Sequence, residues 1–241
     1  MFAGPNGSGK STLKMVLHPK LLGVYLNPDE MERELRTHGI LDLTAYRVTA
    51  AMDEVRAFFR DSTLLQNAGL AVAADSVSAR DGRLIFPRET VNSYVASAIA
   101  EFLRQRLLEA RIPLTLETVM SHPGKVELLA QAQRLGYRTY LYFIATDDPA
   151  INISRVRSRV QRGGHAVPED KIVKRYHASL GLLMDAIRNS NRAYIFDNSG
   201  KGRDRTWIAE VTDGRNLEMR TQRMPAWFKR AVWDKIIART A

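Results

Sequence analysis

The sequence predicts an α/β fold in which helices flank both faces of a parallel sheet. Short apolar segments alternate with longer segments of helical periodicity, and this alternation is typical of parallel, doubly wound sheets. The predicted strands are Leu21–Leu26, Leu114–Leu116, Tyr137–Ala145 and Ala193–Phe196. We expect one domain covering residues 1–241, because a chain of 241 residues supplies enough apolar material for one substantial core.

The first strand of this sheet is expected to be truncated. Met1, Phe2 and Ala3 supply only the end of a strand, so the sheet either starts upstream or opens with a stub. A helix from Ser11 to about His18 should follow the next loop. Beyond the second strand we expect a helical insertion, formed by Glu30–Thr37 with Gly39 as its stop, by residues 43–65 and by Val91–Arg111. Within it, Ser76–Arg88 contains Gly82 and Pro87 and is interpreted as a loop or a short hairpin.

The second half of the chain continues the alternation of strands and helices. Helical periodicity predicts Lys125–Leu135, capped by Gly136, and then Ile151–Arg162, Glu169–Asn189 and Trp227–Ile237. Trp207–Val211 and Leu217–Arg220 are predicted to form a hairpin across Asp213-Gly214. We expect this C-terminal segment to pack against the sheet.

Composition narrows the classes of function. The chain has no cysteine, which excludes disulfides, thiolate catalysis and cysteine-bound zinc. It shows neither a long uncharged apolar run nor a secretory leader, so we expect a soluble, cytoplasmic protein that does not enter a membrane. The net charge of +10 favours a phosphate-rich partner, either a nucleotide or nucleic acid. A lysine-rich tail and an aromatic-basic RNA motif are both lacking, which disfavours nucleic acid as the principal partner.

A glycine-rich segment near the N-terminus has the pattern of a phosphate-binding loop. The motif GxxxxGK[ST] is matched at every fixed position by Gly4-Pro5-Asn6-Gly7-Ser8-Gly9-Lys10-Ser11, and Thr12 follows. Glycines let successive backbone N–H groups curl around phosphate oxygens. Lys10 should reach the β- and γ-phosphates of ATP or GTP, and the Ser11 hydroxyl should bind Mg²⁺. The alternative is a glycine-rich turn before an ordinary helix.

Two carboxylates follow predicted strands directly. Because the carboxyl ends of parallel strands share one edge of a sheet, Asp29 should face the phosphates and accept the proton of an attacking hydroxyl. Glu117 should bind the metal or the acceptor. Each also has a structural alternative: Asp29 could be the N-cap of the next helix, and Glu117 could take part in helix capping with Thr118 or Ser121. Asp75 is a weaker candidate for either role.

Three arginines form a stripe on one predicted helix. Arg155, Arg159 and Arg162 are spaced i, i+4 and i+7, with Arg157 turned away, and the helix stops at Gly163-Gly164. This arrangement is typical of a basic lid, hinged by glycine, which closes over a triphosphate. The alternative is a solvated basic helix. Nearby His165 is interpreted as a loop or packing residue, because no second histidine stands at metal-binding spacing.

These motifs together resemble the zeta-toxin family of P-loop kinases, in the bacterial branch often described as predicted ABC-type ATPases. The resemblance covers nearly the whole chain. It is carried by Gly4–Thr12, Asn27–Glu30, Glu117–Ser121, Arg155–His165, Val167-Pro168 and Arg175-Tyr176.

The resemblance implies an ATP- or GTP-dependent kinase that phosphorylates a sugar hydroxyl, on UDP-N-acetylglucosamine in the best-understood toxins. It assigns phosphates and Mg²⁺ to Lys10 and Ser11, the catalytic base to Asp29, and acceptor or metal contacts to Glu117 and Thr118. Arg155 or Arg159 would steady the γ-phosphate. The toxins carry a basic residue shortly after the matching glutamate and threonine, where this chain has Val119-Met120-Ser121-His122. This departure weakens the expectation of a sugar-nucleotide acceptor more than that of kinase chemistry.

Three classes of function follow from the sequence. A small-molecule kinase is favoured, since candidates for base, lid and acceptor site are all present. The alternatives are a P-loop ATPase that acts with nucleic acid, although no LSGGQ signature is found, and an interaction module that binds an antitoxin protein.

Overall fold

We analysed a computed structural model of the chain, which describes residues 1–15, 17–70, 72–164, 166–200 and 205–240. His165 lies outside these ranges. The structure divides into two compact units: unit 1 comprises Met1–His18 and Glu117–Ala241, and unit 2 comprises Pro19–Leu116. Among the described residues, no helix is both long enough and apolar enough to span a bilayer.

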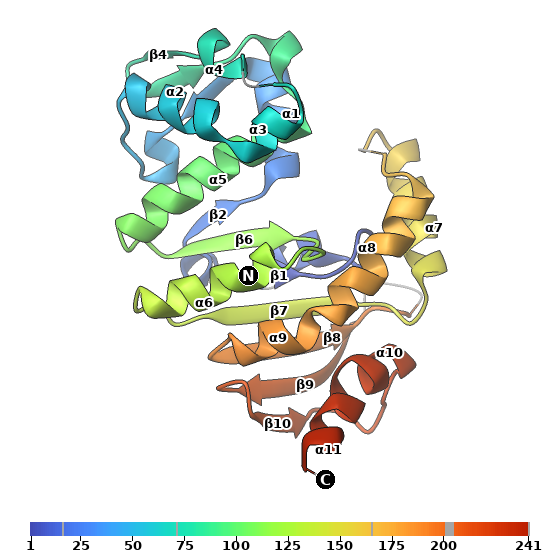
Figure 1. Cartoon of the computed structure of the whole chain (residues 1–241). Helices are drawn as coiled ribbons and strands as arrows, with labels where there is room; N and C mark the ends of the chain where they lie inside the picture. Colours follow the sequence, from blue (N-terminus) through green and yellow to red (C-terminus); the bar gives the residue numbers. More distant parts are fainter. Residues whose placement is uncertain (16, 71, 165, 201–204, 241) are drawn as a thin grey trace. The chain divides into compact units, whose positions relative to one another are not determined.

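Unit 1 is built on a mixed, mostly parallel sheet (Figure 1). Its strands are β1 (Phe2–Ala3), the last two residues of β6 (Leu114–Thr118), β7 (Tyr140–Ala145), β8 (Arg192–Asp197), β9 (Thr206–Thr212) and β10 (Asn216–Met219). The order is β10-β9-β8-β7-β1-β6, in which β6, β1, β7 and β8 are parallel. The antiparallel pair β9–β10 confirms the predicted C-terminal hairpin. Strand β1 has two residues, Phe2 and Ala3, which pair with Glu117 and Thr118 of β6.

Helices cover the sheet of unit 1 and bury its apolar face. They are α6 (Gly124–Arg134), α7 (Pro149–Gln161), α8 (Glu169–Gly181), α9 (Leu183–Arg188), α10 (Ala226–Phe228) and α11 (Asp234–Thr240), the last two joined by a π-helical turn at Lys229–Trp233. Figure 1 shows α6 and α9 against β7 and β8. One hydrophobic cluster joins the inward residues of these strands, such as Phe143 and Ile195, to Leu129 of α6 and to the fully buried Trp227.

Two helix predictions in unit 1 were wrong in detail. The predicted helix Ser11–His18 is instead a short 3₁₀ helix, Lys10–Met15. Pro19 prevents an α-helix from continuing, and a segment this short needs buried contacts that Met15, 77% exposed, does not make. The single predicted helix Glu169–Asn189 is divided at Leu182, next to Gly181, a residue of low helix propensity.

Unit 2 contains the predicted helical insertion. Its helices are α1 (Pro28–His38), α2 (Met52–Asp61), α3 (Thr63–Asn67), α4 (Ala73–Ser76) and α5 (Ser93–Glu109), with 3₁₀ turns at Pro19–Leu21, Thr44–Tyr46 and Arg88–Thr90. Strand β2 (Val24–Leu26) pairs in parallel with the first part of β6. A small antiparallel sheet has the order β3-β5-β4, from Ile40–Asp42, Arg83–Ile85 and Ser78–Arg80. This sheet confirms the hairpin interpretation of residues 76–88, whereas β3 was not predicted. Phe59, Leu84 and Leu103 lie in the core of the unit.

Candidate nucleotide-binding site

The glycine-rich segment forms a closed loop between β1 and the 3₁₀ helix of unit 1. The side chain of Lys10, only 8% exposed, returns into this loop. Its Nζ donates hydrogen bonds to the carbonyl oxygens of Gly4, at 2.9 Å, and Pro5, at 3.0 Å. A buried ammonium needs such partners, because an uncompensated charge is costly away from water. The first residues of the loop therefore hold the positive charge of Lys10 through their carbonyl oxygens.

The backbone of the loop packs so tightly that glycine is required. Gly4 has φ +141°, and a Cβ atom there would lie 2.0 Å from the carbonyl oxygen of Ile144 at the end of β7. Gly7 has φ +75°, and its Cβ would lie 2.6 Å from the carbonyl oxygen of Asn152 in α7. Any other side chain would force the loop away from its supports. The glycines of the motif thus serve the close packing of the loop as well as its curvature.

Buried amide side chains hold the loop from outside the motif. Asn152, in the first turns of α7, is fully buried and donates from Nδ2 to the carbonyl oxygen of Asn6 at 2.6 Å. Its Oδ1 accepts from the hydroxyl of Thr146, and the carbonyl of Thr146 accepts from Tyr176 at 2.7 Å. This relay connects the loop to α8, and burial raises the pKa of Tyr176 to about 12.

A second amide supports the loop from the end of β8. Asn198 donates from Nδ2 to the carbonyl oxygen of Ser8 at 2.7 Å. Ser8 is completely buried, and its Oγ makes no hydrogen bond within the described structure. Sequence reasoning missed both Asn152 and Asn198. The available signal was their position just after the predicted strands β7 and β8, since loops at that edge of a parallel sheet carry the site.

Glu117 lies beside the loop at the end of β6. The hydroxyl of Ser11 donates to Glu117 Oε1 at 2.9 Å. Thr118 Oγ1 accepts from the backbone N–H of Met120 in a tight turn. Helix α6 begins at Gly124 without a side-chain cap, so the helix-capping alternative for Glu117 was wrong. The two residues predicted as metal ligands, Ser11 and Glu117, are therefore direct neighbours. No group of three or more Asp, Glu or His side chains suited to a metal ion is found among the described residues.

Asp29 lies in unit 2, in the first turn of α1. The N-cap of α1 is Asn27, whose Oδ1 accepts from the backbone N–H of Asp29 at 3.0 Å, so the alternative of Asp29 as the N-cap was wrong. The Asp29 side chain is exposed. Asp75, also in unit 2, is exposed and lies 3.6 Å from Arg60.

The arginines of the predicted stripe lie on α7 and at its C-cap, Arg162, and their contacts differ. Arg155 donates to the carbonyl oxygen of Gly200 at 3.0 Å, and its buried Nη1 makes no hydrogen bond within the described structure. Arg159 is half-buried one turn later. Arg162 is exposed at the helix end and donates to the carbonyl oxygen of Ser158 at 3.0 Å. Arg157 points elsewhere and pairs with Glu169.

Comparison with known proteins finds one matching family model and several solved structures of similar fold. Residues 88–204 match the family model described as Zeta toxin. A curated relative, an uncharacterized protein of Haemophilus influenzae (strain Rd), is 28% identical over 69 residues, which cover 29% of this chain and 49% of that protein. The matched segments leave the glycine-rich loop outside the family model, whereas Glu117, Thr118 and the arginines of α7 lie within it.

Solved structures match over most of this chain. The crystal structure of AvrRxo1-ORF1:AvrRxo1-ORF2 with sulphate ions has a TM-score of 0.54 and 16% identity, covering 98% of this chain and 62% of that one. The structure of AvrRxo1-ORF1:-ORF2 with ATP has a TM-score of 0.52 and 14% identity, again covering 98% and 62%. The chain thus spans about half the length of its curated relative and less than two thirds of these solved chains. At such identities the structural similarity shows the fold alone.

The sequence resemblance and the architecture lead to the same assignment. The sheet is mostly parallel and flanked by helices, with the glycine-rich loop after a central strand. The chain therefore shares its α/β fold with these solved structures, and its residues 88–204 match the Zeta toxin family model.

Proposed function

We propose that this protein is a P-loop phosphotransferase that binds ATP or GTP at Gly4–Thr12 and transfers the γ-phosphoryl group to a hydroxyl of a small acceptor. The observation that carries the proposal is the closed loop around the buried ammonium of Lys10. Phosphate oxygens would exchange with the Gly4 and Pro5 carbonyls as partners of Lys10, as in P-loop enzymes. The ATP in one structure of similar fold supports the choice of nucleotide.

The residues present also fit Mg²⁺. Ser11 Oγ and Glu117 Oε1, 2.9 Å apart, are hard oxygen donors, and Mg²⁺ is usually held by one or two protein oxygens together with phosphates and water. A separate carboxylate cluster is therefore not required. When bound, the ion would neutralise negative charge on the phosphates.

The acceptor oxygen attacks the γ-phosphorus, its proton passes to the Asp29 carboxylate, the bond from the γ-phosphorus to the bridging oxygen breaks, and ADP or GDP leaves. Arg155, Arg159 and Arg162 would act on the triphosphate as parts of a lid, and an arginine at the transferred group is worth about a thousandfold or more in rate. Thr118, next to Glu117, would contact the acceptor. Two observations support Asp29 as the base: its side chain is exposed, and Asn27 rather than Asp29 caps α1.

The acceptor we propose is a sugar nucleotide or a related metabolite, of the UDP-N-acetylglucosamine type. The family match over residues 88–204 supports this class, because Glu117 and Thr118 lie inside it. A protein partner of the antitoxin type is part of the same proposal, since the solved structures of similar fold are complexes between two proteins. We place this activity in the cytoplasm, where ATP and sugar nucleotides occur together.

Two substitutions test the proposal. Lys10→Ala should abolish nucleotide binding, whereas Asp29→Asn should leave binding largely intact and stop transfer. Lys14→Ala, in the same 3₁₀ helix, and Asp53→Asn, an exposed acid in the first turn of α2, are matched controls. Binding is measured by calorimetry, and transfer by mass spectrometry of a metabolite extract incubated with protein and ATP.

Each outcome has a consequence. No affinity of the unaltered protein for ATP or GTP with Mg²⁺ refutes the proposal. Equal loss of binding in both variants would reassign Asp29 to structure. Turnover stimulated by DNA or RNA, but by no metabolite, would favour the nucleic-acid ATPase, and binding without any turnover would favour the interaction module.

A further inference from the structure

Arg205 brings a second cation to the glycine-rich loop. It stands directly before β9 in unit 1, and its Nη2 donates to the hydroxyl oxygen of Thr12. The same hydroxyl donates to the carbonyl oxygen of Gly9 at 2.6 Å. No pattern in the sequence pointed to this residue, because 193 positions separate Arg205 from Thr12.

The charge of Arg205 lacks a counter-ion in the described part of the chain. Its side chain is partly buried, and among the described residues no carboxylate lies within ion-pair distance. Burial shifts its pKa below the ordinary arginine value, which reports a desolvated cation. A guanidinium cannot lose its proton in a protein, so an anion beside Arg205 would offset this cost.

The two cations lie at different ends of the loop. Lys10 Nζ contacts the carbonyls of Gly4 and Pro5, where the loop begins, whereas Arg205 contacts Thr12 beyond its end. A triphosphate is a linear chain of charges, so two separated cations address different phosphates along it. The lysine of such a loop takes the β- and γ-phosphates, which leaves the α-phosphate for the other end.

We propose that Arg205 is a further nucleotide-binding residue, which contacts the α-phosphate next to Thr12. The inference rests on the proposed function, since it assumes that a nucleotide occupies the loop. The planar guanidinium presents two parallel N–H donors to phosphate oxygens, a geometry that lysine does not reproduce. Arg205 thus recognises the part of the nucleotide that substrate and product share.

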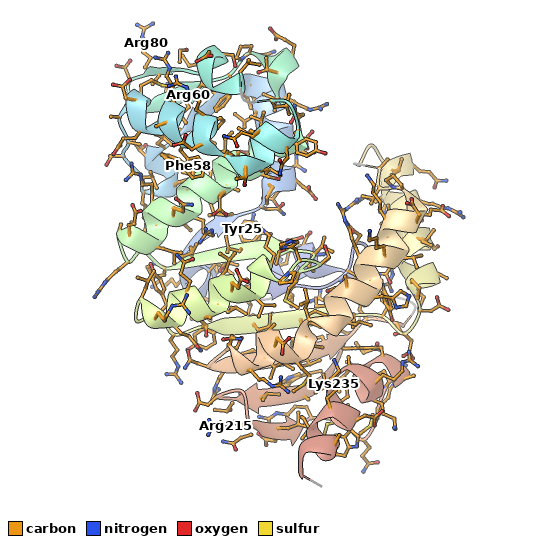
Figure 2. All side chains as sticks on the ribbon, viewed as in Figure 1. Tyr25, Phe58, Arg60, Arg80, Arg215 and Lys235 are labelled. Carbon is orange, nitrogen blue, oxygen red and sulfur yellow. The ribbon has the colours of Figure 1, made fainter. Side chains whose placement is uncertain are left out.

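Calorimetric titration with Mg²⁺-ATP and, separately, Mg²⁺-ADP tests this assignment. Arg205→Gln should raise the Kd for both nucleotides by the same factor, about 10- to 100-fold, because both carry an α-phosphate. Arg205→Lys should show a smaller loss. Arg215→Gln is the matched control: it removes the same charge from the same unit, at the exposed turn between β9 and β10 (Figure 2), and should leave both Kd values unchanged.

Other results overturn the inference. A loss for ATP alone would place Arg205 at the γ-phosphate, and unchanged Kd values would remove it from the site. A fall in the melting temperature of the nucleotide-free protein as large as that of a buried-core substitution would indicate a structural brace instead. Should Arg205→Gln fail to fold, Arg205→Lys decides, since equal binding by that variant and the unaltered protein refutes the bidentate contact. Absence of nucleotide binding by the unaltered protein refutes the proposed function itself, and the inference with it.

Discussion

Asn152 offers the sharpest test of how the fold holds the glycine-rich loop. Replacing it with Leu keeps the approximate size of the side chain but removes both of its hydrogen bonds. The carbonyl of Asn6 loses its donor at 2.6 Å, and the hydroxyl of Thr146 loses one of its two acceptors, the other being the Asp148 carbonyl at 3.3 Å. Thr146 can therefore redirect its proton, whereas the Asn6 carbonyl has no such substitute among the contacts described.

The expected cost follows from these two losses. Because Asn6 is only partly buried, its carbonyl left without a partner costs at most about 1–3 kcal/mol. The lost bond of Thr146 adds roughly 1 kcal/mol, so Asn152→Leu should destabilise unit 1 by at most about 2–4 kcal/mol. For a chain of this size the melting temperature should fall by roughly 5–15 °C. Nucleotide affinity should fall about tenfold or more, since the loop is no longer held in its binding conformation before the ligand arrives.

The assay combines thermal unfolding with calorimetric titration of ATP. Asn216→Leu, at an exposed position of β10, is the control and should change stability by no more than about 0.5 kcal/mol. If Asn152→Leu has the same melting temperature and the same affinity for ATP as the unaltered protein, the relay of hydrogen bonds from α8 to the loop has no energetic role. An equal effect of the control would trace the loss to added apolar surface instead.

Two further predictions concern the same loop and its support. Gly7→Ala should lower the affinity for ATP about tenfold or more, because the added Cβ would meet the carbonyl oxygen of Asn152. The control Gly136→Ala, with φ +86° and open space around the added Cβ, should lower the stability by only about 1–2 kcal/mol through backbone strain. Equal losses of ATP binding in the two variants would refute the packing argument. Alkaline pH should destabilise the fold through Tyr176, because its pKa rises to about 12 on folding: its contribution is complete below pH 10 and disappears as pH passes 12. Tyr176→Phe should flatten that part of the curve of unfolding free energy against pH, and an unaltered curve would show that the phenol is not the titrating group.

The local sequence was enough to predict the glycine-rich loop, the ends of two helices and the sheet. The glycine-rich motif predicted a tightly turned loop after the first strand, because its glycines are needed wherever the backbone turns this closely; phosphate binding by this loop stays a prediction. Gly39 and Gly136 correctly predicted where two helices end, since both adopt left-handed conformations that other residues avoid. The alternation of strands and helices predicted the mostly parallel sheet. These features depend on residues that are neighbours in the chain.

The tertiary structure was needed to identify the 3₁₀ helix, the cap of α1 and the side chains that support the loop. The 3₁₀ helix after the loop replaced a predicted α-helix because so short a segment takes its conformation from packing rather than from propensity. Asn27 rather than Asp29 caps α1, a choice between residues two positions apart that depends on the extended backbone at position 27. Asn152, Asn198 and Arg205 reach the loop from positions 146 or more residues away in the chain, and no local pattern marks them. A motif specifies its own backbone, but the side chains that hold it are chosen by the fold that surrounds it.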